Sequence, residues 1–382
     1  MIDTVYYDEK IRFIGQQLID VYKSKGIVYC GINGPYDDPE TKVRNLSHLI
    51  VIASIEILKY DNSDLVETLV CMGRELISLR DNKNIYCMRE KEGKDQCNGV
   101  IGHAWVLEAY YYLYKVLKDR EYLAIADSII GNHEFSYELG LWGRPGMGSD
   151  DRAIDYTLNH QLWFAASLAE INKELKSNEY ENQINVFLKK LDNNMKLSKQ
   201  GKVAHEIYSK IGRKYAFKSK IKRVVNLSQD ILGLKSYAYK EVGYHVFNLM
   251  AIARLFNERK DCLFLDSPKI KKAFAYVNKG SYLKELERDN VTLDASFKNK
   301  IDKAEEKAIN IYGYPYNVPG FELLYIDKIF DNQIRNATLG HCIKRQFELT
   351  YDGNEKRFRN RCHDKVVINY RVYEYYRYLE VN

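Results

Sequence analysis

A helical pattern of apolar residues repeats along most of this 382-residue chain, and it constrains the fold more than any other feature. Apolar residues recur at i, i+3, i+4 and i+7, which is typical of amphipathic helices. The chain has only six prolines, which agrees with a mainly helical protein because proline interrupts helices. The pattern predicts helices at residues 8–24, 45–59, 63–80, 101–117, 120–132, 154–174, 180–197, 241–257, 268–277, 281–288, 297–311 and 366–380.

Five of the eight histidines lie where a predicted helix begins. Each follows a short polar or glycine-containing stretch and precedes an apolar helical pattern. The first two intervals are 55 and 57 residues, enough for two helices and two loops per unit. The units share a pattern but no sequence identity, so only the architecture repeats. The five histidines are His48, His103, His160, His245 and His363.

The loops between the predicted helices alternate between short connections and long segments of unusual composition. Helical hairpins joined in this way form two layers with the long loops on one face. We therefore expect an all-α closed barrel whose helices aim their first turns at a shared cavity. No linker divides the chain, so residues 1–382 are predicted to form one domain. A few short strands are expected in loops, at residues 27–30, 85–88 and 202–208.

Charge and targeting signals limit the partners of the chain. The net charge is +6, and the densest basic run, residues 210–223, has no nucleic-acid motif beside it. This run is either a solvated loop or a contact for an anionic glycan, a nucleotide-sugar or a membrane surface. The N-terminal sequence MIDTVYYDEKIRF lacks the apolar core of a secretory signal, and no apolar stretch is long enough to span a membrane. We expect a cytoplasmic protein without nucleic-acid partners, and a homodimer is allowed.

The cysteines do not form a disulfide or metal pattern. They are seven, scattered along the chain, and include no CxxC pair, which favours free thiols in a reducing compartment. Three of them are near histidines, but their spacing fits no standard zinc motif. No metal or other cofactor is predicted. The three cysteines are Cys97, Cys342 and Cys362.

Two loops combine polar groups with the beginning of a helix. In PYDDPETKVRNLSH, Arg44 can bind a carboxylate or sugar hydroxyls in a forked geometry, or pair with the neighbouring acids. In QCNGVIGHAWVLE, Gly99 and Gly102 allow close approach to the backbone. Trp105 follows them, either as a core residue or as a platform on which a pyranose stacks.

The segment WGRPGMGSDDRAIDYTLNHQ is the richest in polar groups. Asp150, Asp151 and Asp155 precede His160, and the last two carboxylates are spaced i, i+4. Paired carboxylates suit acid–base work on a glycosidic bond because their proximity separates their proton affinities. Acids also favour helix N-termini through capping and the helix dipole, so a structural role stays open.

Two further groups complete the candidate site. The segment YGYPYNVPGFE is too polar and rigid for a plain connector, and its substrate-binding candidates are Tyr314, Tyr316, Asn317 and Glu322. His245 and His363 come from different helices, so they can flank a sugar carbon and exchange its proton from opposite sides.

Three helix starts resemble those of the six-hairpin toroid enzymes that act on carbohydrates. TLNHQLWFAASLAEI, GYHVFNLMAIARL and CHDKVVINYRVYEYY are similar to inner helices of the N-acylglucosamine 2-epimerase superfamily. This resemblance implies an (α/α)6 toroid, with His245 and His363 as the acid–base pair, Arg44 as a substrate anchor and His160 in the pocket. The family usually has an acid and a tryptophan after the later histidine, whereas this chain has Phe247 and Asn248.

A second resemblance is to unsaturated glucuronyl hydrolases, which share the toroid. DYTLNHQLWFAA is similar to their inner helix with an essential aspartate, which implies that role for Asp155. Their other aspartate has no counterpart in GVIGHAW, so hydrolysis ranks second.

The first functional hypothesis is a sugar epimerase or isomerase that uses histidine acid–base chemistry. The alternatives are a glycoside hydrolase or lyase for uronic-acid-containing oligosaccharides, acting through Asp155, and a non-catalytic toroid that binds a glycan during polysaccharide assembly. The predicted catalytic residues are His245, His363 and Asp155. The predicted substrate-binding residues are Arg44, His48, His103, Trp105, Asp150, Asp151, His160, Tyr314, Tyr316, Asn317 and Glu322.

Overall fold

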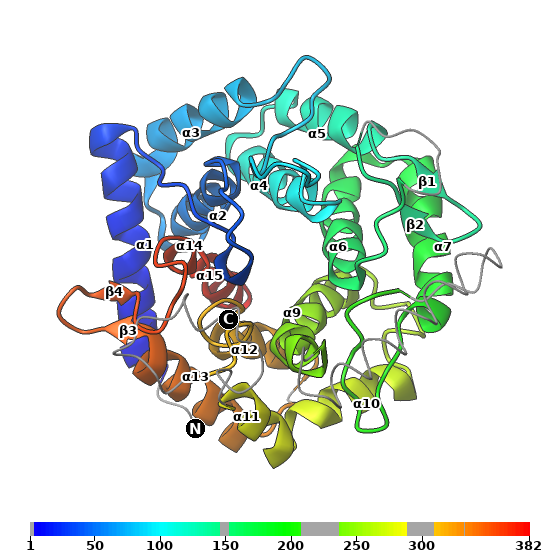
Figure 1. Cartoon of the computed structure of the whole chain (residues 1–382). Helices are drawn as coiled ribbons and strands as arrows, with labels where there is room; N and C mark the ends of the chain where they lie inside the picture. The colour runs from blue at the N-terminus through cyan, green and yellow to red at the C-terminus, as the bar shows by residue number, and fades with distance from the viewer. Residues whose placement is uncertain (1–3, 146–152, 208–236, 289–308, 332) are drawn as a thin grey trace.

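The computed structural model describes residues 4–145, 153–207, 237–288, 309–331 and 333–382, and these form two concentric rings of helices (Figure 1). The inner ring contains α2 (Val43–Tyr60), α4 (Ile101–Leu117), α6 (Leu158–Leu175), α9 (Tyr237–Glu258), α12 (Pro319–Ile329) and α15 (Tyr373–Val381). Each of these helices packs against the next, and α15 packs against α2, so the ring closes. The predicted all-α (α/α)6 toroid is therefore confirmed.

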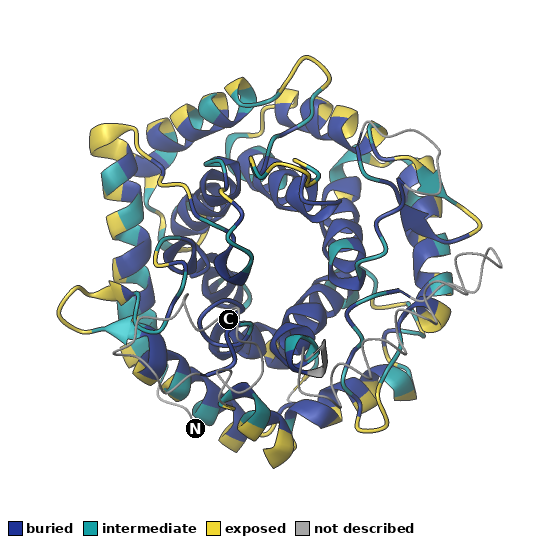
Figure 2. Ribbon diagram, viewed as in Figure 1, coloured by how far each residue is buried: buried dark blue, intermediate teal, exposed yellow. Residues whose placement is uncertain are grey.

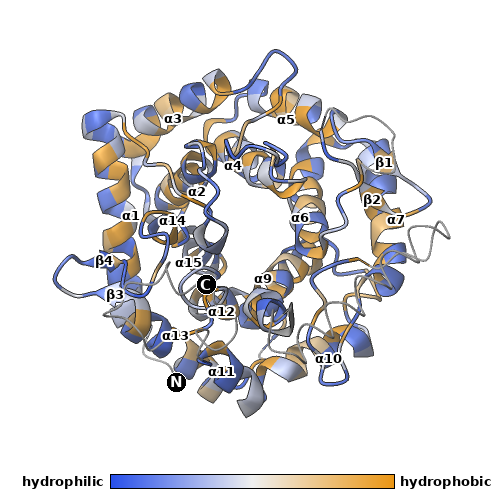
Figure 3. Cartoon of the chain, in the orientation of Figure 1, coloured by the Kyte–Doolittle hydropathy of each residue, from blue (hydrophilic) through white to orange (hydrophobic). Residues whose placement is uncertain are grey.

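The outer ring covers the inner one. It contains α1 (Val5–Lys25), α3 (Val66–Ser78), α5 (Glu121–Gly131), α7 (Asn178–Asn194), α10 (Pro268–Val277) and α13 (Asn336–Thr350). Figure 2 shows that the inner helices are buried on nearly all sides, whereas the outer helices keep an exposed outer stripe. Figure 3 shows the matching mixture of hydrophilic and hydrophobic residues along outer helices such as α1 and α3. Amphipathic helices thus form the outside and more uniformly apolar helices the inside.

Three consecutive inner helices end in the same way. Asp61, Lys118 and Lys176 follow α2, α4 and α6 with left-handed backbone angles, φ 52°, 57° and 56°. Each donates its backbone N–H to a carbonyl of the last turn of its helix, which closes the helix and turns the chain. The repeat expected from the histidine spacing is therefore present in the backbone.

Some predicted elements differ from the structure. Helices α12 and α13 were not predicted, and α12 is so thoroughly buried that it has almost no polar face to reveal a period. The predicted helix 366–380 is interrupted near Arg371, between α14 (Val367–Tyr370) and α15. The predicted helix 297–311 lies largely outside the described residues.

The strands are few and short. They form two antiparallel hairpins, β1 (Phe135–Ser136) with β2 (Leu141–Trp142), and β3 (Tyr351–Asp352) with β4 (Arg357–Phe358). None lies at a position predicted from the sequence. Residues 85–88 and the described part of 202–208 make only isolated bridges, and residues 27–30 make none.

A buried network of charges crosses the axis of the inner ring. Arg254 of α9 pairs with Glu170 of α6 at 2.6 Å and with Glu108 of α4 at 3.2 Å. Arg377 of α15 contacts the same two carboxylates, also at 2.6 and 3.2 Å. All four side chains are at most 5% exposed. The network ties four inner helices together and closes the barrel below the helix N-termini.

Within the described residues, no helix has the combination of length and apolar character that crossing a membrane requires.

Candidate functional site

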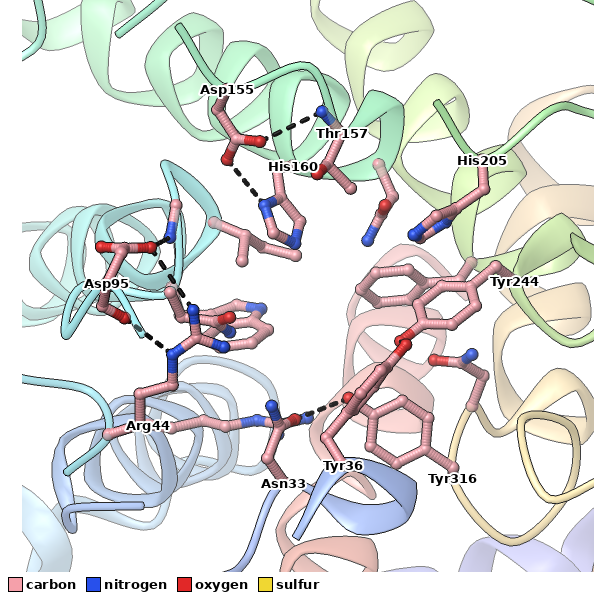
Figure 4. A pocket seen from close by; sticks show the side chains of 18 of the residues that line it. Asn33, Tyr36, Arg44, Asp95, Asp155, Thr157, His160, His205, Tyr244 and Tyr316 are labelled. Carbon is pink, nitrogen blue, oxygen red and sulfur yellow. Dashed lines mark hydrogen bonds and ion pairs between the residues drawn. The ribbon is translucent and has the colours of Figure 1, made fainter. Parts of the chain in front are cut away.

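A cavity of about 270 Å³ opens where the loops enter the N-terminal ends of the inner helices. Its walls come from the segments before α2, α4, α6, α12 and α15, the first turns of α2, α4, α6 and α9, and the segment between α7 and α9 (Figure 4). The structure places several predicted site residues in these walls: Arg44, Trp105, Asp155, His160, Tyr316 and Asn317.

Asp155 and His160 form the best-defined polar contact in the cavity. The Asp155 carboxylate accepts a 2.7 Å hydrogen bond from His160 Nδ1, and it also accepts the backbone N–H groups of Val100 (3.0 Å) and Thr157 (3.1 Å). Burial alone would raise the pKa of Asp155, but His160 and the two amides outweigh burial and hold the pKa well below its ordinary value. The carboxylate therefore stays ionised and fixes the proton of His160 on Nδ1, which leaves Nε2 toward the cavity (Figure 4).

Gly99 makes room for this contact. Its φ is +67°, and a Cβ atom there would lie 1.9 Å from Asp155 Oδ2 and 2.5 Å from His160 Nδ1. Gly93 has a similar φ of +73° but nothing within 4 Å of the same position. It therefore offers a matched control for the backbone strain alone.

We expect Gly99→Ala to lower the free energy of unfolding by about 2–4 kcal/mol, because backbone strain and overpacking add. Gly93→Ala should cost only the strain, about 1 kcal/mol. Urea denaturation of both variants measures the difference. Equal losses would show that the Asp155–His160 contact does not depend on the space above Gly99.

A second carboxylate in the cavity was not predicted. Asp95 accepts the N–H groups of Cys97 (3.0 Å) and Gly99 (2.5 Å), and Arg89 lies 3.4 Å from it. Asp95 and Asp155 thus bind consecutive amides, those of Gly99 and Val100. The signal was an aspartate just before a glycine-rich helix start, in DQCNGVIG, which parallels Asp155 before TLNH.

His205 was also missed, because it begins no helix. It lies between α7 and α9, is 9% exposed and packs on the ring of Tyr244 with a centroid distance of 4.9 Å. Figure 4 shows the His160 and His205 rings directed toward the same cavity from different segments. Asn159 also lines the cavity, and its buried Oδ1 accepts no hydrogen bond from the described part of the chain.

Aromatic rings cover much of the remaining wall. The Tyr36 and Tyr244 hydroxyls are 2.8 Å apart, and the Tyr316 hydroxyl donates to Asn33 Oδ1 at 2.7 Å. Trp105 stacks under the Arg44 guanidinium, 4.5 Å from ring to Cζ. Rings with a polar edge suit ligands that have both apolar faces and hydroxyl groups.

His245 does not line this cavity, and the structure does not bring it together with His363 there as predicted. Its Nδ1 accepts the N–H of Val203 at 3.2 Å, and its Nε2 donates to the carbonyl of Ala273 at 3.0 Å. The ring is fully buried between the two helical layers, and burial lowers its pKa to about 3. His245 therefore ties inner helix α9 to the outer layer as a neutral group.

Replacing His245 with alanine should destabilise the fold and leave the cavity intact. We expect the free energy of unfolding to fall by about 1–3 kcal/mol above pH 6.5, because one backbone N–H group and one carbonyl group lose their hydrogen-bond partner. The native pKa is lower than the unfolded one, so the unfolded wild type binds the extra proton as the pH falls below about 6.5. The difference in the free energy of unfolding between wild type and variant should therefore shrink by about 1.4 kcal/mol per pH unit toward pH 5. Urea denaturation from pH 5 to 8 measures it, and a constant difference would contradict the neutral assignment.

Three other predicted histidines also lie outside the cavity wall. His103 accepts the N–H of Tyr86 at 3.1 Å and bonds His133 at 2.8 Å, and burial lowers its pKa well below the ordinary value. His48 is buried and stacks on Tyr373 at 4.0 Å. His363 pairs with Asp37 in the loops. The positions of His48, His103 and His363 do not support the roles predicted for them.

The remaining predicted residues lie behind the wall or outside the described chain. Tyr314 and Glu322 are buried but do not line the cavity, and Glu322 pairs with Arg371 at 3.0 Å. Asp150 and Asp151 lie outside the described residues. No group of three or more potential metal ligands occurs among the residues that the structure describes.

Comparison with known proteins gives one relative by sequence and several by fold. No protein-family model matches the chain. It is 29% identical to Archaeal glycosylation protein Q of Haloferax volcanii over 322 residues, which cover 80% of this chain and 79% of that protein.

Three solved structures share the toroid over nearly the whole chain. Cellobiose 2-epimerase from Bacillus thermoamylovorans B4167 has a TM-score of 0.59 at 12% identity, covering 97% of this chain and 99% of that one. An unsaturated glucuronyl hydrolase specific for heparin has a TM-score of 0.59 at 10% identity, covering 98% of this chain and 97% of that one. A sugar epimerase from a ruminal bacterium has a TM-score of 0.60 at 11% identity, covering 95% of each chain. The predicted resemblance to toroid carbohydrate enzymes is confirmed as a likeness of fold.

Proposed function

We propose that this chain is a sugar epimerase or isomerase in which His160 and His205 transfer a proton at a sugar carbon. The observation that carries the proposal is the 2.7 Å contact from His160 Nδ1 to the ionised, buried Asp155. A histidine oriented by a carboxylate in this way presents a basic Nε2 to its ligand and is stabilised when it becomes protonated.

In the proposed step, His160 Nε2 removes the proton from a carbon next to a carbonyl group. The electron pair of the broken C–H bond moves toward the carbonyl oxygen, forming an enediol-type intermediate. Protonation of the same carbon by a protonated His205 inverts its configuration as the electron pair returns from the oxygen. Protonation of the former carbonyl carbon isomerises the sugar, with the proton of the neighbouring hydroxyl group passing to the former carbonyl oxygen. Atoms and electrons balance without any redox partner, and the two histidines end with one proton exchanged.

The surrounding side chains are suited to hold the sugar during this step. The rings of Tyr36, Tyr244 and Trp105 give apolar faces, and Asn159 offers a buried acceptor for a hydroxyl group. The fold relatives that are named epimerases support the same class of reaction, and the sequence relative named as a glycosylation protein supports a role in glycan metabolism.

The second candidate is a glycoside hydrolase that uses Asp95 and Asp155. Two carboxylates on consecutive amides of one cavity favour it. Hydrolysis needs one carboxyl group as a proton donor. Asp155 does not suit that part because its pKa is held low, so Asp95 would have to supply the proton.

Product analysis separates these candidates. Purified protein is incubated with hexoses, N-acetylhexosamines, uronic acids and disaccharides of these sugars, and the products are resolved by chromatography. A new stereoisomer or ketose without cleavage supports the proposal. Release of monosaccharides with no isomer would favour the carboxylate pair, and unsaturated products would indicate a lyase. Saturable binding with no product would favour a glycan-binding toroid.

A further inference from the structure

Cationic side chains outnumber carboxylates around the cavity. Among the described residues in its walls, two are carboxylates, Asp95 and Asp155. Six are cations: Arg44, Arg89, Lys94, Arg144, Lys240 and Arg371.

Carboxylates behind the wall balance part of this charge, since Arg371 already pairs with Glu322 and Glu374. Asp38 is fully buried and forms ion pairs with three cations: Arg89 at 3.1 Å, Lys91 at 2.9 Å and Lys94 at 2.7 Å. These cations hold the pKa of Asp38 below its ordinary value against the effect of burial. Arg89 also lies 3.4 Å from Asp95, so two negative charges face three positive ones on this side of the cavity.

Arg44 is the most deeply placed of these cations. It is 2% exposed, lines the cavity and pairs with Glu40 at 3.2 Å, yet its buried Nε has no hydrogen-bond partner among the residues that the structure describes. Burial raises the pKa of Glu40 to about 7 in spite of Arg44, so near neutral pH part of the Glu40 population is uncharged. Arg44 thus keeps an unused donor and an incompletely balanced charge at the cavity.

Access to the cavity is one-sided. The network of Arg254, Arg377, Glu108 and Glu170 fills the axis below it with side chains that are at most 5% exposed. A ligand therefore enters from the loop side, where Lys94 and Lys240 stand beside Tyr36 with their Nζ atoms 5.7 and 5.1 Å from the ring centroid. The volume of about 270 Å³ is small for a ligand site, which limits the occupant to about one sugar unit.

We infer that the sugar unit bound in this cavity is anionic, with a carboxylate or a phosphate that Arg44 binds with help from Lys240. This inference rests on the proposed function for the identity of the ligand as a sugar. Guanidinium groups bind carboxylate and phosphate with paired, charge-assisted hydrogen bonds, which a neutral sugar cannot provide. A cation-rich cavity also binds neutral sugars less tightly, because a neutral sugar leaves the positive charges of the cavity without a partner.

Isothermal titration of the full chain with monosaccharides tests this inference. The acidic probes are D-glucuronate, D-galacturonate and D-mannuronate, the phosphate probes are the 6-phosphates of glucose, galactose and mannose, and the neutral probes are the three parent sugars. We expect at least one acid or phosphate to bind at least about 10-fold more tightly than its parent, with affinity falling as salt rises. Preference for the acids or for the phosphates identifies the source of the charge.

The variants locate the interaction. Arg44→Gln should weaken binding of the preferred anion about 10- to 100-fold, and Lys240→Gln, which removes a less buried cation, should weaken it by a smaller factor. Arg345→Gln is the control, because Arg345 pairs with Glu287 and Glu348 on the outer ring. The inference is overturned if no anion binds more tightly than its parent sugar, or if Arg44→Gln and Lys240→Gln both bind the anion as wild type does. Anion binding without turnover of any sugar would instead leave this inference standing and remove the proposed function.

Discussion

Replacement of His160 with alanine is expected to lower kcat for sugar epimerisation or isomerisation by about 10²- to 10⁴-fold, which is the usual contribution of a general base. KM should change little, because His160 acts on one C–H bond while other side chains hold the sugar. The reason is geometric: Asp155 fixes the His160 ring at 2.7 Å and leaves Nε2 as a base at the cavity. Steady-state kinetics on the substrate found by product analysis measure the effect.

His341→Ala is the matched control for this prediction. His341 lies on outer helix α13, its side chain is 39% exposed, and its imidazole pairs with Glu287 at 3.1 Å. Its removal should leave kcat unchanged. If His160→Ala kept more than about a tenth of the wild-type kcat, His160 would not be the base, and the carboxylates Asp95 and Asp155 would become the candidates.

Replacement of Arg254 with methionine is expected to destabilise the protein by about 3–5 kcal/mol, because it leaves two buried carboxylates, Glu108 and Glu170, with one arginine instead of two. Arg254 is fully buried and contacts both Glu170 and Glu108. The pKa of Glu170 is depressed chiefly because Arg254 and then Arg377 outweigh burial, so it stays charged. Loss of Arg254 removes the stronger of these two partners of Glu170.

Urea denaturation measures this loss, with Arg345→Met as control. The Arg345 side chain is 28% exposed and pairs at the surface with Glu287 and Glu348, so its replacement should cost at most about 1 kcal/mol. A loss of similar size in both variants would mean that the axial network does not hold the inner ring together. The double variant Arg254→Met with Glu170→Leu should recover part of the stability, because one buried carboxylate, Glu108, then pairs with one arginine, Arg377.

The sequence predicted the architecture well because the architecture repeats. Amphipathic outer helices such as α1 and α10 follow the helical period, and the histidine intervals match the backbone repeat at Asp61, Lys118 and Lys176. Helix α12 was missed for a physical reason: it is buried on nearly all sides, so its sequence has no polar face to set a period.

The candidate site was predicted only in part, because one sequence signal serves two structural roles. His103, His160 and His245 lie at similar positions in the predicted helices, although in the structure His103 and His160 lie in the first turns of α4 and α6 and His245 lies further into α9. His160 lines the cavity, whereas the other two bond backbone groups between the layers. Whether each imidazole ring faces the cavity or lies between the two helical layers depends on tertiary packing, which the sequence pattern does not show. Asp95 and His205 were missed because they belong to loops whose path the helical pattern does not set.

Proton exchange in D2O tests the central claim most directly. Wild type and Asp155→Asn are incubated with the sugar panel, and NMR follows deuterium entering carbon-bound positions of intact sugars. Asparagine keeps the shape of Asp155 but removes the charge that orients His160, so we expect exchange in the wild type and an exchange rate reduced by about 10²- to 10⁴-fold in the variant. Equal exchange rates in the two proteins, or isomerisation by the wild type without any deuterium incorporation, would contradict the account.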